Sequence, residues 1–147
     1  MRVTMDCCGY MLAVLSLTIL TAWGGVYDAQ SIPNDVQITG TWGAQFVGTV
    51  EGKGTPHDDT FVMELKQDGS KVTGTLRFEG LDLDFRVSGN VTGTAFSYTS
   101  KAMLSPSCEA TLSGATTVEA ASGTFKGSQT QTNCEGTAVG QVTAVRR

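Results

Sequence analysis

The side chains that could carry out acid–base chemistry lie in two places along the chain. His57 is the single histidine, and it is followed by Asp58 and Asp59 within the glycine-rich segment 51–59. An imidazole beside carboxylates could act as a general base or help to hold a metal ion. Asp82 and Asp84 are spaced so that, on a strand, they would lie on one face as a carboxylate pair.

Both groups also have a plain structural interpretation, which we favour. Polar residues in a glycine-rich loop are common turn formers in contact with solvent. Asp82 and Asp84 alternate with apolar residues beside Arg86, as on the solvent face of a strand. No serine lies in a Gly-x-Ser-x-Gly motif that would mark a nucleophile. We therefore predict that the protein is not an enzyme, and we favour catalysis less than the binding of a small molecule or of another protein.

Residues 1–24 have the pattern of a signal peptide. Arg2 precedes an apolar run over 11–20, and Ala22 and Gly24 place small residues before a cleavage point after Gly24. A retained membrane anchor is the alternative, but a spanning helix needs about 20 apolar residues and this run is shorter. We predict a signal peptide over 1–24, a polar extension over 25–37 and one domain over 38–147. The protein would be secreted or periplasmic, and its mature chain would not insert stably into a membrane.

Two of the four cysteines lie in the predicted signal peptide and two in the predicted domain. Cys7 and Cys8 belong to the predicted signal peptide, which leaves Cys108 and Cys134 as an even pair in an oxidising compartment. We expect these two to form one disulfide, worth roughly 3 kcal/mol in the chain-entropy model. Two thiols and one histidine are a poor ligand set for structural zinc, so we expect neither a metal nor another cofactor.

The charge distribution argues against nucleic-acid binding. The formal net charge is −4, and the basic residues do not cluster apart from Arg146 and Arg147 at the end of the chain. Proteins that bind nucleic acids present a basic patch or stripe. We therefore expect no nucleic-acid partner.

Apolar residues recur at every second position from residue 38 onward, which is the period of a strand with one buried face. In the segment 81–91, Leu83, Phe85 and Val87 alternate with polar or charged residues. The same pattern predicts strands over 38–50, 60–67, 71–79 and 81–91, around Phe96 and Tyr98, from Cys108 to Val118, from Gly123 onward, and over 136–146, with 103–107 as a loop.

These strands, joined by short turns, predict an all-β fold. We expect a single antiparallel eight-stranded up-and-down barrel, because closure removes the two exposed edges of the sheet. A β-sandwich is the alternative, since strand patterns do not fix the order of the strands. An outer-membrane barrel is disfavoured, because Gly48, Gly74 and Gly114 lie on the apolar face and would contribute little to a lipid-facing band.

The first predicted strand carries a short motif, because residues 38–42 read ITGTW and end at Trp42. A Gly-x-Trp at this place in an eight-stranded meander resembles the opening of the calycins, the group of lipocalins, fatty-acid-binding proteins and avidins. The resemblance implies that Trp42 plugs one end of the barrel. It also implies that a basic residue near the last strand, here Arg146, packs over the indole ring with a cation–π contact of about 1 kcal/mol.

The calycin architecture often carries small apolar molecules, so the resemblance implies a barrel that binds a small hydrophobic ligand. The candidate interior residues are Trp42, Phe46, Phe61, Met63, Leu65, Leu76, Phe78, Leu83, Phe85, Phe96, Tyr98, Leu112 and Phe125. A solid core is the alternative interpretation of these side chains. A different function would be that of a protein–protein module, such as a periplasmic protease inhibitor that reaches its partner with the segment 25–35.

Overall fold

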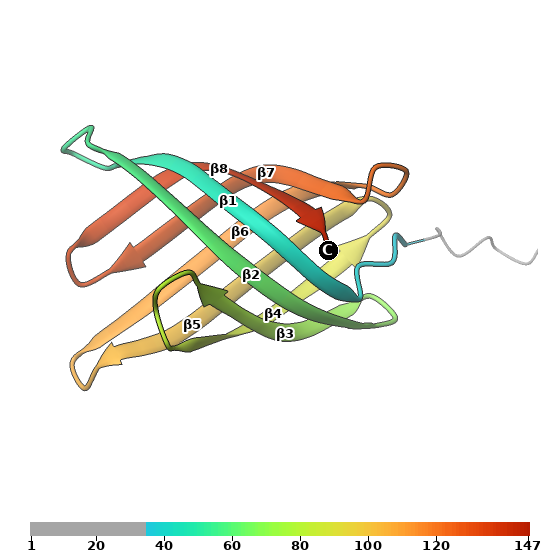
Figure 1. Cartoon of the computed structure of the whole chain (residues 1–147), viewed down its shortest axis with the longest axis horizontal. Coiled ribbons are helices and arrows are strands. Elements are labelled where there is room, and N and C mark those ends of the chain that lie inside the picture. The colour runs from blue at the N-terminus through green and yellow to red at the C-terminus, as the bar shows by residue number, and fades with distance from the viewer. Residues whose placement is uncertain (1–34) are drawn as a thin grey trace, which may run out of the picture. The chain divides into compact units, whose positions relative to one another are not determined.

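The computed structural model describes residues 35–147, which form a closed β-barrel of eight antiparallel strands (Figure 1). Each strand pairs with its neighbour in sequence and β8 pairs with β1, so the sheet has no free edge. This confirms the predicted up-and-down barrel and rules out the sandwich. The strands are β1 (Gly40–Val50), β2 (Pro56–Asp68), β3 (Lys71–Phe78), β4 (Asp84–Thr92), β5 (Ala95–Ser105), β6 (Cys108–Glu119), β7 (Thr124–Asn133) and β8 (Gly136–Arg146).

The predicted signal peptide over 1–24 and most of the predicted extension, up to residue 34, lie outside the described residues. The part that is described contains no helix, and so no helix there is long and apolar enough to cross a membrane.

The two-residue period determines which side chains enter the barrel. On β6, Ala110, Leu112 and Val118 are buried, whereas most residues between the inward positions face solvent. The same alternation on the other strands gives one continuous hydrophobic core. A slip of one residue in any strand pairing would turn its apolar side chains to water, so the register is strongly specified.

Two glycines allow neighbouring strands to approach closely where the sheet bends. A Cβ atom at Gly74 would collide with the carbonyl oxygen of Glu64, and one at Gly140 would collide with that of Val47. Both oxygens belong to the backbone of the adjacent strand, so they cannot move aside without disturbing the ladder. Glycine at these positions permits the local curvature that a small barrel needs.

The two ends of the barrel differ (Figure 1). At one end, called the closed end below, are the turns 69–70, 93–94 and 120–123 together with the segment 35–39. The Val36 amide donates to the carbonyl of Gly93 at 2.9 Å, and the Ile38 amide donates to Oε1 of Gln67 at 2.9 Å, so this segment is fastened to the barrel. The other end, called the mouth, carries the loops 51–55, 79–83, 106–107 and 134–135.

Three predicted boundaries near the mouth were wrong. The strand expected over 81–91 begins only at Asp84, because 79–83 turn at Gly80, which has a φ of 82°. The predicted loop 103–107 is mostly strand, since β5 runs to Ser105 and shifts register between Met103 and Ser105. Such an irregularity hides a strand end from a strict two-residue pattern.

The third wrong boundary concerns the glycine-rich segment 51–59, which was expected to be a loop. Strand β2 begins at Pro56, which pairs with Thr49 of β1. A proline is tolerated as the first residue of a strand, where its missing N–H is not needed by the ladder. His57 and Asp59 therefore lie on a strand, and on the same face as the buried Phe61.

Candidate functional site at the mouth of the barrel

Trp42 and Arg146 close the end opposite the mouth. The indole ring of Trp42 is fully buried, and its Nε1–H donates to the carbonyl of Ile38 at 2.8 Å. The guanidinium carbon of Arg146 lies 4.8 Å from the centroid of that ring, and the same side chain donates to the carbonyl of Gln37. This is the contact that the Gly-x-Trp motif implied, and it obstructs access from this end.

The half of the interior next to the closed end is packed with aromatic and aliphatic side chains. The ring centroids of Trp42 and Phe125 are 5.1 Å apart, and those of Phe96 and Phe125 are 5.6 Å apart. This part of the barrel is core rather than pocket. The predicted interior residues that are buried outside the cavity described next are Trp42, Phe46, Phe61, Met63, Leu65, Leu76, Phe96, Tyr98 and Phe125.

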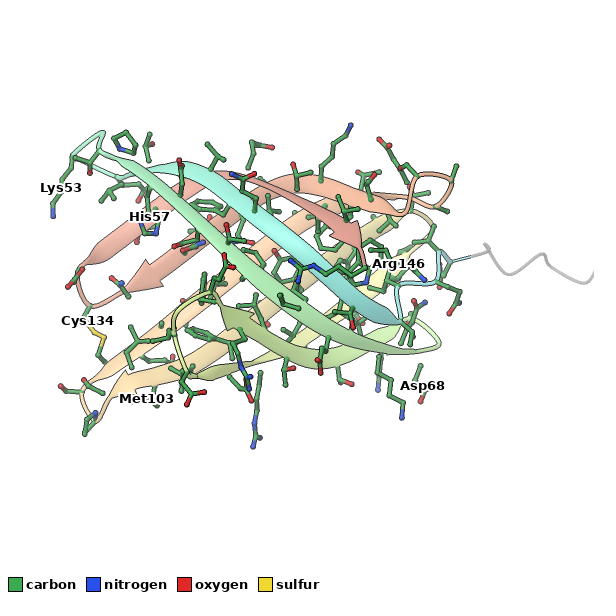
Figure 2. All side chains as sticks on the ribbon, viewed as in Figure 1. Lys53, His57, Asp68, Met103, Cys134 and Arg146 are labelled. Carbon is green, nitrogen blue, oxygen red and sulfur yellow. A yellow bond between two sulfur atoms is a disulfide. The ribbon has the colours of Figure 1, made fainter. Side chains whose placement is uncertain are left out.

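A cavity of about 430 Å³ occupies the mouth. It lies among the inward residues nearest the mouth on all eight strands, and its size is in the range of small-molecule pockets. Of the residues predicted from the sequence to bind a ligand, Phe78, Phe85 and Leu112 line this cavity, whereas Leu83 packs partly buried against the core. Figure 2 shows His57 toward the mouth and Arg146 toward the closed end.

One wall of the cavity is polar. His57 and Asp59 reach it from β2, and Gln131 reaches it from β7. Nε2 of His57 lies 3.0 Å from Oδ2 of Asp59 and 3.3 Å from Oε1 of Gln131. The two strands are separated by β1 and β8, where Gly48 and Gly140 pair in register.

A second polar pair lies deeper, at the next inward position of β7. The hydroxyl of Tyr98 on β5 donates to Oε1 of Gln129, and both residues are about 98% buried, with 2% exposure each. Gly114 stands between them in the register, so the phenol ring can lie flat across β6. Burial raises the pKa of the Tyr98 hydroxyl well above its ordinary value, which itself is above neutral pH, so the hydroxyl is a hydrogen-bond donor.

Three buried polar atoms beside these groups have no hydrogen-bond partner within residues 35–147. They are Nε2 of Gln129, Nε2 of Gln131 and Oγ of Ser100. Ser100 pairs in register with Leu112, which pairs with Gln131, and the last two line the cavity. Buried polar atoms without partners are uncommon in folded proteins, and one that belongs to a residue of the cavity wall, as in Gln131, is typical of a binding site.

The rim of the cavity combines apolar and acidic residues. Leu81 and Leu104 line it and are 40% and 41% exposed. Glu79 and Glu135 add two carboxylates, against the single lysine of the lining, Lys53. The two leucines offer apolar contact to an apolar molecule that enters, and the two carboxylates would repel an anion.

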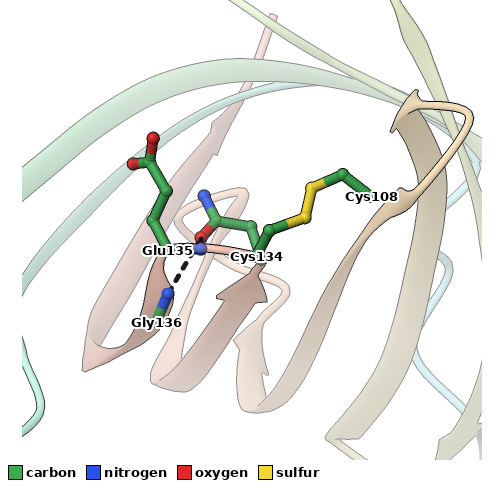
Figure 3. Close-up of a disulfide and its surroundings, with 5 residues drawn as sticks. Cys108, Cys134, Glu135 and Gly136 are labelled. Atoms are coloured by element: carbon green, nitrogen blue, oxygen red, sulfur yellow. Dashed lines mark hydrogen bonds between the residues drawn. A yellow bond between two sulfur atoms is a disulfide. The ribbon is translucent and has the colours of Figure 1, made fainter.

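The disulfide predicted between Cys108 and Cys134 is confirmed, and it lies at this rim (Figure 3). Its Cα atoms are 5.6 Å apart, and it joins the start of β6 to the β7–β8 turn. In that turn, Oδ1 of Asn133 accepts from the Glu135 amide at 2.8 Å and the Gly136 amide at 3.2 Å. The bond is compatible with an oxidising, exported environment.

Sequence reasoning overlooked the polar wall because it treated 51–59 as a loop. The alternation of Phe61, Met63 and Leu65 could have been continued backwards to Asp59 and His57, which would have placed both inside. Likewise, counting forward in twos from Phe125 leads to Gln129 and Gln131. A polar residue at an inward position interrupts the hydrophobic signal, and so it is missed when only apolar residues are counted.

The fold and the site define a small closed antiparallel β-barrel with a cavity that opens at one end. No protein-family model and no curated protein matches the chain. A solved structure of a protein of unknown function from the DUF3598 family of Nostoc punctiforme is similar to it with a TM-score of 0.45 and 14% identity, over 75% of this chain and 48% of that one. The chain therefore spans about half the length of that protein.

Proposed function

We propose that this protein is a calycin-type barrel that binds a small, mainly apolar molecule in the mouth cavity, in an oxidising compartment outside the cytoplasm. The observation that carries the proposal is the contrast between the two halves of one interior. The closed half is filled with aromatic side chains, whereas the mouth half holds about 430 Å³ of space. That is nearly three times the volume of an engineered apolar cavity of about 150 Å³ that binds benzene.

The lining supports a ligand that is mostly apolar. Phe78, Phe85 and Leu112 provide large apolar surfaces, and Ala110 and Ala138 leave the space between them open. Burying apolar ligand surface against such a wall contributes about 25 cal/mol per Å². The polar wall formed by His57, Asp59 and Gln131 would orient the molecule rather than supply most of the affinity.

The test is binding of the neutral fluorophore N-phenylnaphthylamine to the purified protein, followed by its fluorescence. We expect saturable binding that is weakened about tenfold or more by Ala110→Phe. Ala110 lines the cavity and is 7% exposed, so the added ring occupies the space that the fluorophore needs.

The matched control is Ala115→Phe, which makes the same change on the outer face of the same strand, where the residue is exposed. It should leave the affinity unchanged. Absence of saturable binding to the native protein, or equal affinity in the native protein and the correctly folded Ala110→Phe variant, would contradict the proposed function.

A further inference from the structure

We propose that the ligand of the mouth cavity is an uncharged molecule with an apolar body and a carbonyl oxygen, such as an ester or ketone. This inference rests on the proposed function, because it concerns the same cavity. It is carried by the amide of Gln131, which lines the cavity and whose nitrogen atom is a buried donor without a partner in the described part of the chain.

The orientation of Gln131 follows from the proton on His57. Nε2 of His57 faces two oxygen atoms, Oδ2 of Asp59 at 3.0 Å and Oε1 of Gln131 at 3.3 Å. An ionised carboxylate can only accept a hydrogen bond, so Nε2 must carry the hydrogen. Gln131 therefore presents its oxygen to the imidazole, and its Nε2 is left free of that contact. Asp59 acts here as a positioning residue.

Oε1 of Gln129 is engaged by Tyr98. The phenol is protonated at neutral pH at its ordinary pKa, burial raises that pKa further, and its O–H donates to Oε1 of Gln129. The carbonyl of this amide is thus occupied, and its Nε2 remains as a second donor, two residues deeper on the same face of β7.

The amide nitrogen of Gln131 at the cavity wall requires an acceptor, whereas Gln129 is not among the lining residues. Leaving a buried N–H group without a partner is unfavourable, and a ligand that supplies an oxygen removes this penalty on binding. A carbonyl oxygen accepts two hydrogen bonds and brings no donor of its own. A hydrocarbon would leave the Gln131 amide unpartnered, and an alcohol would add a further donor to a wall that already presents one.

The charge of the lining favours a neutral carbonyl over a carboxylate. Asp59, Glu79 and Glu135 line the cavity, and Lys53 is the one lysine or arginine among its lining residues. A carboxylate ligand would place a further negative charge beside these groups in a partly desolvated site, which is unfavourable. A neutral ester or ketone gives the Gln131 amide its acceptor without that repulsion.

The experiment compares four ligands of similar chain length by displacement of N-phenylnaphthylamine from the native protein. They are methyl octanoate, the alkane of matching length, the matching alcohol and octanoate. We expect methyl octanoate to bind about tenfold more tightly than the alkane, which is the gain of one or two hydrogen bonds, and more tightly than the alcohol or octanoate. This comparison needs no variant.

The variant Gln131→Met keeps the side-chain length and removes the amide. It should reduce the preference for the ester over the alkane from about tenfold to within about threefold, with little change in alkane binding. Gln141→Met is the matched control, because Gln141 lies exposed on the outer face of β8, and it should keep the native preference.

The outcomes separate the two proposals. If the fluorophore and the alkane bind but the ester has no advantage, or if octanoate or the alcohol binds most tightly, the carbonyl proposal is overturned while the proposed function stands. The same holds if folded Gln131→Met keeps the full preference for the ester. If neither the fluorophore nor any of the four ligands binds, the proposed function itself fails.

Discussion

At the scale of single residues, the absence of one side chain makes the polar interior possible. Gly114 on β6 pairs in register with Tyr98 on β5 and with Gln129 on β7. The phenol ring of Tyr98 crosses over Gly114 to reach the amide of Gln129. A Cβ atom at Gly114 would overlap the ring of Tyr98 and lie 2.7 Å from its hydroxyl oxygen. The glycine therefore decides whether the two polar groups can meet.

We predict that Gly114→Ala lowers the free energy of unfolding by about 1–3 kcal/mol, because the added methyl group displaces Tyr98 and breaks its bond to Gln129. Urea denaturation of the native protein and the variant measures the change. The same substitution in a Tyr98→Ala background should have a much smaller effect, since the clash is gone. Equal losses in both backgrounds would show that the ring is not the cause.

The residue scale is also where prediction from the sequence was least complete. The contact between Trp42 and Arg146 could be expected from a motif and a resemblance. The roles of Gln129 and Gln131 could not, because a glutamine at an inward position looks like an error in the pattern until its partners are known. The partner of Gln129 is Tyr98, which lies 31 positions away in the sequence, and no local sequence signal connects the two residues.

At the scale of the elements, the strands could be predicted well in their middles and poorly at the mouth. In the middle of a strand, one face meets the core and the other meets solvent along its whole length. The alternation therefore places Phe85 and Val87 inside correctly. Near the mouth, Leu81 and Leu104 face an opening rather than a core, so their exposure follows the shape of the rim. The exact ends of β4 and β5 depend on turn geometry and on the register shift after Met103, which the period does not encode.

The disulfide is the element-scale feature that we expect to hold the rim together. Replacing both Cys108 and Cys134 by alanine should lower the free energy of unfolding by roughly 3 kcal/mol, because the bond restricts the unfolded chain between β6 and the β7–β8 turn. Chemical denaturation with and without a reducing agent measures this. The reductant should act on the native protein and leave the variant unchanged, and a native protein indifferent to reduction would argue against the bond.

At the scale of the whole molecule, the barrel is half core and half pocket, and this division could not be read from the sequence. The thirteen side chains predicted inside are all large and aromatic or aliphatic, yet only three of them border the cavity. Near the mouth, Ala110 and Ala138 border open space, whereas at the other end the rings of Phe96, Phe125 and Trp42 pack against one another. Volume is a property of the assembled ring of strands, not of any one strand.

The closed end gives the last prediction, because it joins the two ends of the described chain. Arg146, close to the end of β8, lies over Trp42 near the start of β1 and also holds the carbonyl of Gln37, so one side chain secures both the plug and the segment that covers it. We expect Arg146→Ala to lower the free energy of unfolding by about 1 kcal/mol. It should also make the buried indole more accessible to acrylamide, seen as stronger quenching of tryptophan fluorescence.

Arg147→Ala is the matched control, since it removes the same charge one position away and should change stability by less than about 0.5 kcal/mol. Equal effects of the two substitutions would mean that net charge, rather than the contact with Trp42, accounts for the loss.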